Sequence, residues 1–342
     1  MRQLEFTKYT SCGNNFIIID EVESQSVAES EWTDVAFTAT NPYFGIGADN
    51  LLVIQRATEA KLTEINHTRG YWTAPPSFTP DTLLFRMFEP DGTEALCCGN
   101  GLMSIAHHLR ARHDITGASI ATEIPRETPK VVALGSMGTG ERSWVELAAP
   151  TQTPNELADR SRLTSLTDEI DRIEGLQFEF RQHDLSPFHD GTLLTLDGYL
   201  VFTGEPHLVV FPHEGIKPEA LGETVFRSTT SRGESAQCKR VNFGTWLLRR
   251  IGYHANNRFP GLFPAGVNVN MAHVVDGQRA IEYRTYERGI NRETLACGTG
   301  ALAVSYVAQA LGLVTDDCLA LIPHRCRWFD PNAAIDIRAS GT

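Results

Sequence analysis

Two short stretches far apart in this chain share one pattern: Leu96-Cys97-Cys98-Gly99-Asn100-Gly101 and Leu295-Ala296-Cys297-Gly298-Thr299-Gly300. Each stretch opens a segment with helical periodicity, which predicts a helix that begins directly after Cys98 or Cys297. The unpaired amides and the positive dipole end of a helix start stabilise a thiolate and also bind a carboxylate. Two such turns on opposite sides of one carbon could remove a proton from one face and return it to the other.

Similar elements precede the two cysteines. Strands are expected near residues 16–20, 51–54, 83–88, 131–134 and 143–147 in the first half, and near 176–180, 192–202, 207–211, 268–270 and 281–286 in the second. Insertions are expected at residues 57–82, which are polar, and at 215–262. The second includes a Ser/Thr/Arg/Gly-rich loop at 227–234 and a short helix expected near 246–251. The shared order predicts an internal duplication with two domains, residues 1–150 and 151–327. We expect the final strand, residues 328–342, to return to the first half.

Composition excludes several classes of function. The chain has 342 residues, 42% of them hydrophobic, and a formal net charge of −12, which argues against nucleic-acid binding through a broad basic surface. No apolar run approaches membrane-spanning length, and the first residues do not resemble a signal peptide. The seven cysteines are scattered and odd in number, which favours a reducing cytoplasm over a disulfide framework.

Cys98 and Cys297 could instead be buried structural cysteines, but two matching copies favour a shared chemical role. A metal site is the weaker reading, because Cys97 and Cys98 are adjacent and no Cys-x-x-Cys or His-x-x-x-His pair accompanies them. His107 and His108 lie in the first predicted helix and are expected at its partly exposed surface. No metal and no organic cofactor is predicted, so helix-terminus amides would have to stabilise a carbanion.

Several further motifs carry a family resemblance. They are Lys8-Tyr9-Thr10-Ser11-Cys12-Gly13-Asn14-Asn15-Phe16, Gly45-Ile46-Gly47-Ala48-Asp49-Asn50, Phe88-Glu89-Pro90-Asp91-Gly92, Gly204-Glu205-Pro206-His207, Val267-Asn268-Val269 and Tyr286-Glu287-Arg288-Gly289. Together with the two cysteine frames, the chain resembles the diaminopimelate epimerase family of cofactor-independent two-cysteine racemases. The resemblance implies an α/β (α+β) fold of two pseudo-symmetric halves. Each half would be a curved mixed or antiparallel sheet wrapped around a central helix, with the active site in the cleft between them.

The resemblance also implies roles for individual residues. Cys98 and Cys297 would be the catalytic acid/base pair. The expected substrate-binding residues are Asn14, Asn50, Glu89, Gly99, Asn100, Glu205, His207, Asn268, Glu287, Arg288, Gly298 and Thr299. Of these, Gly99, Asn100, Gly298 and Thr299 would hold the reacting carboxylate through their amides. The partner would be a small amino-acid substrate, with no nucleic acid and no membrane, and a homodimer stays open.

The chain departs from the family pattern in the binding pocket. The family usually has Gln at the position of Asn50 and Asn at the positions of Glu89 and Glu205. We therefore keep three functions: epimerisation of LL- to meso-diaminopimelate as the family default, racemisation of a basic amino acid such as lysine, histidine or ornithine, and binding of an amino acid without catalysis. If both extra carboxylates are ionised and face the ligand, they favour the second function, because they could hold a cationic side chain. If Glu205 instead pairs with Arg288, or either Glu points to solvent, diaminopimelate still fits.

Overall fold

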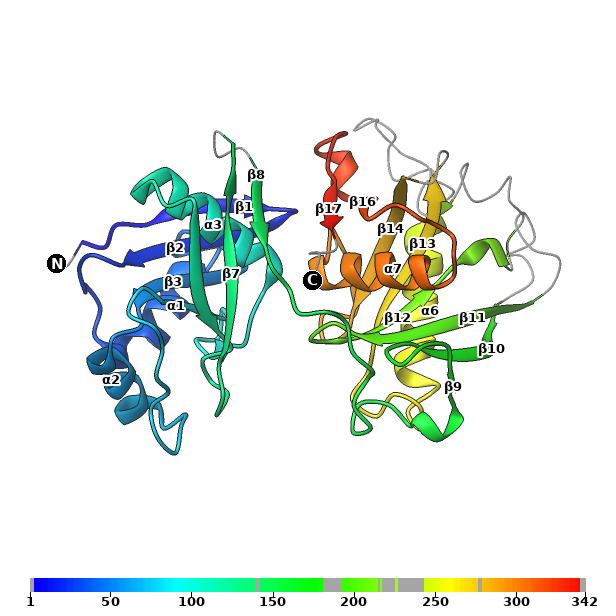
Figure 1. Ribbon diagram of the computed structural model, residues 1–342, viewed down its shortest axis with the longest axis horizontal. Coiled ribbons are helices and arrows are strands. Elements are labelled where there is room, and N and C mark those ends of the chain that lie inside the picture. The colour runs from blue at the N-terminus through cyan, green and yellow to red at the C-terminus, as the bar shows by residue number, and fades with distance from the viewer. Residues whose placement is uncertain are drawn as a thin grey trace. The chain divides into compact units, whose positions relative to one another are not determined.

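The structure is a computed structural model that describes residues 3–138, 142–180, 192–214, 216, 225–226, 243–275 and 279–338 (Figure 1). The chain divides into two compact units, Met1–Leu147 and Ala148–Thr342. The division falls close to the boundary expected at residue 150.

A mixed sheet forms the first unit. Its strands are β1 (Thr7–Ser11), β2 (Asn14–Glu21), β3 (Asn50–Arg56), β4 (Leu83–Phe88), β5 (Glu94–Ala95), β6 (Gly117–Thr122), β7 (Lys130–Met137) and β8 (Arg142–Val145). They follow the order β1-β2-β3-β4-β6-β7-β8, with β5 paired to β4. The β2–β3 and β4–β6 pairs are parallel and the others antiparallel.

Helix α3 (Gly99–His113) lies at the centre of this unit. It contacts β1 and β2 near one end of the strand order and β7 and β8 at the other, so the sheet curves around it. Its buried apolar face packs with Leu52 and Phe85 of the sheet. Helix α1 (Trp32–Thr40) packs instead against Leu51 and its neighbours, because successive strand residues face opposite sides of a sheet.

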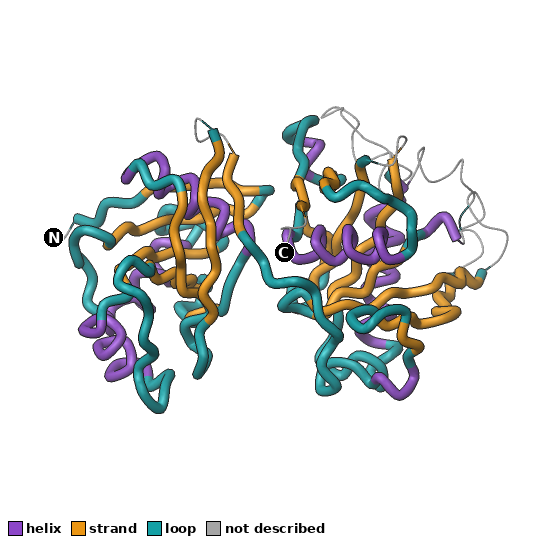
Figure 2. Tube along the Cα trace, in the orientation of Figure 1, coloured by secondary structure: helices purple, strands orange, loops and turns teal. Residues whose placement is uncertain are grey.

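The second unit also contains one mixed sheet (Figure 2). Its strands are β9 (Thr164–Ser165), β10 (Asp171–Glu179), β11 (Leu193–Phe202), β12 (Pro206–Val210), β13 (Asn268–Val275), β14 (Ala280–Glu287), β15 (Arg292–Thr294), β16 (Cys318–Pro323) and β17 (Ile335–Arg338). The order is β17-β16-β14-β13-β12-β11-β10-β9, with β15 paired to β14. The β12–β13 and β14–β16 pairs are parallel.

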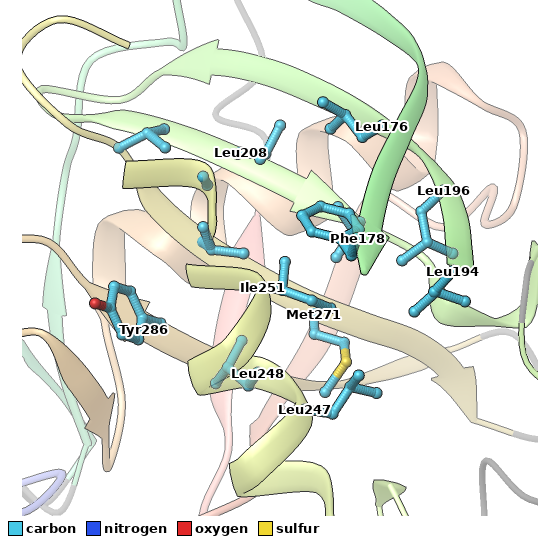
Figure 3. Packing of buried hydrophobic residues seen from close by; sticks show 14 of the residues in the cluster. Leu176, Phe178, Leu194, Leu196, Leu208, Leu247, Leu248, Ile251, Met271 and Tyr286 are labelled. Atoms are coloured by element: carbon cyan, nitrogen blue, oxygen red, sulfur yellow. The ribbon is translucent and has the colours of Figure 1, made fainter. Parts of the chain in front are cut away.

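In the described part of the second unit, one helix covers each face of the sheet. Helix α7 (Gly298–Ala310) contacts strands from β11 to β17 and packs with Val209 and Phe211. Helix α6 (Phe243–Asn257) packs against the opposite face, where Figure 3 shows Leu247, Leu248 and Ile251 beside Phe178 and Met271. The second sheet is therefore buried on both sides by apolar layers.

The two units share one topology, which confirms the predicted duplication and the fold class of two similar halves. Strands β1 to β7 correspond in order and pairing to β11 to β17, and α3 corresponds to α7. The register agrees as well: Phe16 pairs with Asn50 in the first sheet, and His207 pairs with Asn268 in the second. The first unit adds β8 at one edge, and the second adds β9 and β10 at the other.

The C-terminal strand does not return to the first unit, so that expectation is wrong. Strand β17 pairs antiparallel with β16, and its Ile335 and Ile337 pack onto the α7 side of the second core. The reason is topological, since β17 takes the place in its sheet that β7 takes in the first.

The two expected insertions contain helices where the structure describes them. Helix α2 (Glu59–Arg69) lies within residues 57–82, and it begins after Thr58 and ends at Gly70 in a left-handed conformation. Helix α6 lies within 215–262 and extends the short helix expected near 246–251. The expected Ser/Thr/Arg/Gly-rich loop at 227–234 lies outside the described residues.

Candidate active site

Cys98 and Cys297 take the same structural position in their units. Each is the N-cap of its helix, with φ −142° and ψ 122° at Cys98 and φ −135° and ψ 117° at Cys297. The carbonyl of each accepts the first helical hydrogen bond at 2.9 Å, from Leu102 and Ala301 respectively. The backbone amides of the three residues after each cysteine therefore have no acceptor within the helix and can bind an anion.

The first glycine after each cysteine leaves space open. A Cβ placed on Gly99 or Gly298 would meet no atom within 4 Å. The second glycine is different, because a Cβ on Gly101 would lie 3.2 Å from Phe85 and one on Gly300 would lie 2.5 Å from Asn270. The second glycine thus serves packing, whereas the first leaves its backbone open to an approaching ligand.

Asn14 and Asn100 meet beside Cys98. Asn100 donates from Nδ2 to Oδ1 of Asn14 at 2.8 Å, and Asn100 is buried. Asn14 begins β2 directly after a turn in which Cys12 and Gly13 both have positive φ, 48° and 89°. The turn places Asn14 at the edge of β2 that faces the start of α3.

Asn50 and Glu89 form a second contact in the first unit. Asn50 begins β3 and is buried, and its side chain hydrogen-bonds the Glu89 carboxyl. Burial raises the pKa of Glu89, and the nearby charges of Asp91 and Asp49 raise it further, while the Asn50 bond lowers it. Glu89 is therefore easier to protonate than an ordinary surface glutamate, and a protonated carboxyl offers one donor and one acceptor, like an amide.

The sulfur of Cys297 has two polar neighbours. It accepts a hydrogen bond from the Gly300 amide at 3.4 Å, and the Thr299 hydroxyl lies 3.3 Å from it. Both groups can donate to a thiolate. The Tyr283 hydroxyl donates to the Cys297 carbonyl at 3.1 Å and fixes the backbone at this turn.

His207 extends this network away from the sulfur. Asn270 donates from Nδ2 to Nδ1 of His207 at 2.9 Å, so the ring carries its proton on Nε2 and can donate it to the Thr299 hydroxyl at 3.1 Å. Complete burial, aided by the Arg288 charge, lowers the pKa of His207 to about 3. The ring is therefore neutral at pH 7, and the Thr299 hydroxyl is free to point its proton at Cys297.

Glu205 and Arg288 form an ion pair in the second unit. Arg288 donates from Nε to Oε2 of Glu205 at 3.0 Å and makes a second bond to the same oxygen from Nη2. Its backbone amide donates to Asn268 at 2.9 Å. Next to it, burial raises the pKa of Glu287, the Glu205 charge adds to this, and a hydrogen bond from Thr294 opposes it.

The sequence interpretation missed two buried arginines that support the cysteine turns. Arg86 in β4 binds Glu94, and Arg284 in β14 binds Glu293 at 2.7 Å. Each glutamate lies four residues before its cysteine. The signal was present in the sequence as Glu-x-Leu-x-Cys-Gly-x-Gly in both halves, preceded by a matching arginine.

The structure thus brings the predicted residues together within each unit. In the first unit Asn14 meets Asn100 next to Cys98, and Asn50 meets Glu89. In the second unit the contacts form two sets, one of Cys297 with Thr299 and His207, the other of Arg288 with Glu205 and Asn268. Cys97 takes no part, since burial raises its pKa to about 12 and keeps it a neutral packing residue. The meeting of Cys98 with Cys297 stays a prediction.

The chain is similar to diaminopimelate epimerases. Residues 6–133 match the family profile of diaminopimelate epimerase. The diaminopimelate epimerase of Methanothrix thermoacetophila is 28% identical over 325 residues, which covers 92% of this chain and 84% of that protein. The diaminopimelate epimerase of Archaeoglobus fulgidus is 28% identical over 319 residues, which covers 91% and 83%.

The structure is also similar to solved structures of other enzymes. A hydroxyproline epimerase from Agrobacterium vitis with bound trans-4-hydroxy-L-proline is 12% identical with a TM-score of 0.48, over 93% of this chain and 80% of that one. A methylitaconate-delta-isomerase is 10% identical with a TM-score of 0.49, over 99% of this chain and 89% of that one.

None of the helices in the described ranges has the length and apolar character that a membrane span requires.

Proposed function

We propose that the chain, like the diaminopimelate epimerases it resembles, is a cofactor-independent amino-acid epimerase in which Cys98 and Cys297 act on opposite faces of one substrate carbon. One thiolate removes the α-proton while the other thiol protonates the opposite face. The roles exchange in the reverse direction, so the resting enzyme carries one thiolate and one thiol.

The observation that carries this proposal is the equivalence of the two cysteines. Both are N-caps with matching backbone angles, and both precede a helix in the same place of a duplicated fold. A buried structural cysteine has no need of this position. A proton donor and acceptor that exchange roles need similar surroundings, and a duplicated helix start supplies them.

Helix-start amides supply the second requirement of the reaction. An amino-acid α-proton is a weak acid, so the negative charge that develops on the substrate must be stabilised in place. The amides of Gly99 and Asn100 in one unit, and of Gly298 and Thr299 in the other, would bind the substrate carboxylate. The open space at Gly99 and Gly298 supports this role.

We propose diaminopimelate as the substrate, because of the Glu205–Arg288 pair. A substrate with a cationic side chain would bind best to a carboxylate that has no other counterion. Glu205 already has one, because it is bound to Arg288. Burial also raises the pKa of Glu89, so its charged form is less favourable there than at the surface. The far end of diaminopimelate carries one ammonium and one carboxylate, and an Arg–Glu pair offers a partner for each of these charges.

The test follows α-deuterium incorporation by NMR in D₂O. LL- and meso-diaminopimelate are compared with lysine, ornithine and histidine. We expect exchange and epimerisation with diaminopimelate, and a loss of epimerisation of at least about a thousandfold in Cys98→Ser and in Cys297→Ser. Cys97→Ser is the matched control and should keep the activity of the unmodified chain.

Other outcomes would redirect the assignment. Near-full activity in either catalytic-cysteine variant would contradict the two-base mechanism. Exchange with a basic amino acid alone would favour the basic-amino-acid racemase. Tight binding of an amino acid without any proton exchange would favour a binding protein.

A further inference from the structure

A cluster of metal-ligating side chains lies in the first unit, at the opposite end of α3 from Cys98. Asp20, near the end of β2, lies against His108 and His113 of α3. Its Oδ2 is 2.8 Å from Nε2 of His108 and 2.6 Å from Nε2 of His113. The three ligand atoms lie within 4.8 Å of one another. Two ring nitrogens thus converge on one carboxylate oxygen.

Neighbouring groups hold these three side chains in place. The other carboxylate oxygen of Asp20, Oδ1, accepts the Val22 amide at 3.0 Å, which leaves Oδ2 to face the rings. Nδ1 of His113 lies 3.8 Å from Glu23, so a carboxylate stands behind the ring on the side away from Asp20. Tyr9 packs edge-on against His108 with ring centroids 5.8 Å apart. A carboxylate behind the ring also orients metal-binding histidines, and one stands behind His113, whereas Nδ1 of His108 has no hydrogen-bond partner among the described residues.

The surroundings favour a cation that is partly open to water. The side chains of His108, His113 and Asp20 are 2%, 15% and 20% exposed. The cluster is therefore enclosed on one side and accessible on the other. It also lies at the C-terminal end of α3, where the helix dipole is negative. His108 was expected at the surface, and its burial corrects that expectation.

We propose that Asp20, His108 and His113 bind a divalent transition metal ion of the zinc class. Two imidazole nitrogens and one carboxylate oxygen form a donor set that zinc and cobalt accept, with water completing the coordination. Ligand atoms of a tetrahedral zinc lie about 3.3 Å apart. A small outward movement of each side chain would admit the ion. The site would join β2 to α3 and would play no part in the chemistry at Cys98.

The alternative is a hydrogen-bonded cluster without a metal. In that case the Asp20 carboxylate accepts one hydrogen bond from each of the two histidines. The two readings differ in what the cluster does with an added ion. A metal site binds one equivalent with histidine-like ligands, whereas a hydrogen-bonded cluster binds none.

The first experiment titrates the full metal-free chain with Co²⁺ under reducing conditions and records the visible d–d absorption. Cys98 and Cys297 are replaced by serine in this background, so that this thiol pair does not compete for the ion. We expect one equivalent of Co²⁺, displaced by Zn²⁺. Asp20→Asn and His113→Gln should each weaken binding at least tenfold. His107→Gln, which changes the neighbouring histidine on the same helix, should not change the affinity.

A second variant separates lost binding from lost folding. His113→Cys replaces an imidazole by a thiolate and should bind Co²⁺ with a new sulfur-to-metal charge-transfer band that the parent lacks. Thermal midpoints of the metal-free variants by circular dichroism identify any that fail to fold. No saturable Co²⁺ binding by the parent would overturn the proposal. Equal affinity in the parent and in folded Asp20→Asn and His113→Gln would overturn it as well.

Discussion

Arg86 and Arg284 hold equivalent places in the two units, each bound to the glutamate that lies four residues before a helix-start cysteine. Both arginines are buried, and both stand two residues before equivalent aromatic residues, Phe88 and Tyr286. Each salt bridge links a short strand, β5 or β15, to the longer strand it pairs with, β4 or β14. The helix, α3 or α7, begins a few residues later. The positions of the two thiols therefore depend on salt bridges that are buried away from solvent.

Breaking one of these pairs should cost much stability. Glu293→Gln leaves the Arg284 charge buried without its counterion, and we expect a loss of about 3–5 kcal/mol in the free energy of unfolding. The measurement is urea denaturation at pH 7. The exposed pair of Arg112 and Glu5 is the control, since Arg112→Ala should cost less than about 1 kcal/mol. Equal losses in the two variants would contradict the prediction.

The glycines after the cysteines should separate function from stability. Gly99→Ala and Gly298→Ala meet no neighbouring atom, so we expect unfolding free energies within about 1 kcal/mol of the parent. Because the new methyl group would stand where the carboxylate approaches, KM should rise at least tenfold. Gly300→Ala should instead destabilise the chain by about 1–3 kcal/mol through its clash with Asn270. A parent-like KM in Gly99→Ala and Gly298→Ala would argue against amide binding of the substrate.

Removing the Thr299 hydroxyl should make Cys297 less reactive. Thr299→Val deletes a donor to the sulfur and also leaves the Nε2 proton of His207 without its acceptor. We expect the rate of iodoacetamide alkylation of Cys297 at pH 7 to fall at least fivefold. The rate is measured by peptide mass spectrometry. Alkylation of Cys98 in the same sample is the internal reference. Thr299→Ser keeps a hydroxyl and should react at the parent rate. An unchanged rate in Thr299→Val would show that the hydroxyl does not activate Cys297.

His207 should make the fold sensitive to acid. Its pKa is lowered from 6.5 to about 3 in the folded chain, so below pH 6.5 the unfolded chain binds a proton that the folded chain does not. The free energy of unfolding should fall by at most about 1.4 kcal/mol per pH unit from this group as pH drops from 6.5 towards 3. Urea denaturation between pH 7 and pH 4.5 should show a shallower decline in His207→Gln. Parallel declines would show that His207 does not contribute.

The substrate assignment predicts the effect of restoring the family residues. Diaminopimelate should be turned over by the unmodified chain with a kcat/KM at least a hundredfold above that for lysine, ornithine or histidine. The combined change Glu89→Asn and Glu205→Asn should not improve it, because Glu205 is already paired with Arg288 and burial raises the pKa of Glu89. A variant that gains diaminopimelate activity and loses activity on a basic amino acid would establish the basic substrate instead.

Much of the fold could be predicted because local patterns agree with the final structure. The strand expected at 83–88 is β4, and the helices expected after Cys98 and Cys297 are α3 and α7. The family resemblance and the isomerase class are confirmed by the epimerase relatives. Helix α1 was missed because its sequence, with Thr33, Val35 and Thr38, has weak helix preference. Tertiary packing of Trp32 stabilises it instead.

The site was less predictable where it depends on long-range contacts. Nothing local in the sequence indicates that Glu205 binds Arg288, or that Asp20 meets two histidines from another element. Burial decides the state of Glu89 and His207, and burial is a property of the assembled sheet. The matching Arg–Glu pairs could have been found by aligning the two halves against each other.

The residues two positions after the cysteines break the symmetry of the duplicated fold. Thr299 lies against the Cys297 sulfur, while Asn100 is bonded to Asn14. If the proposed function holds, the two thiols need not hold their protons equally, and one protonation state of the free enzyme will predominate. A catalyst cannot alter the equilibrium ratio of two epimers, so the ratio of forward to reverse kcat/KM stays fixed by the substrate. The inequality must then appear as a difference in how much free enzyme is in the protonation state that each epimer requires.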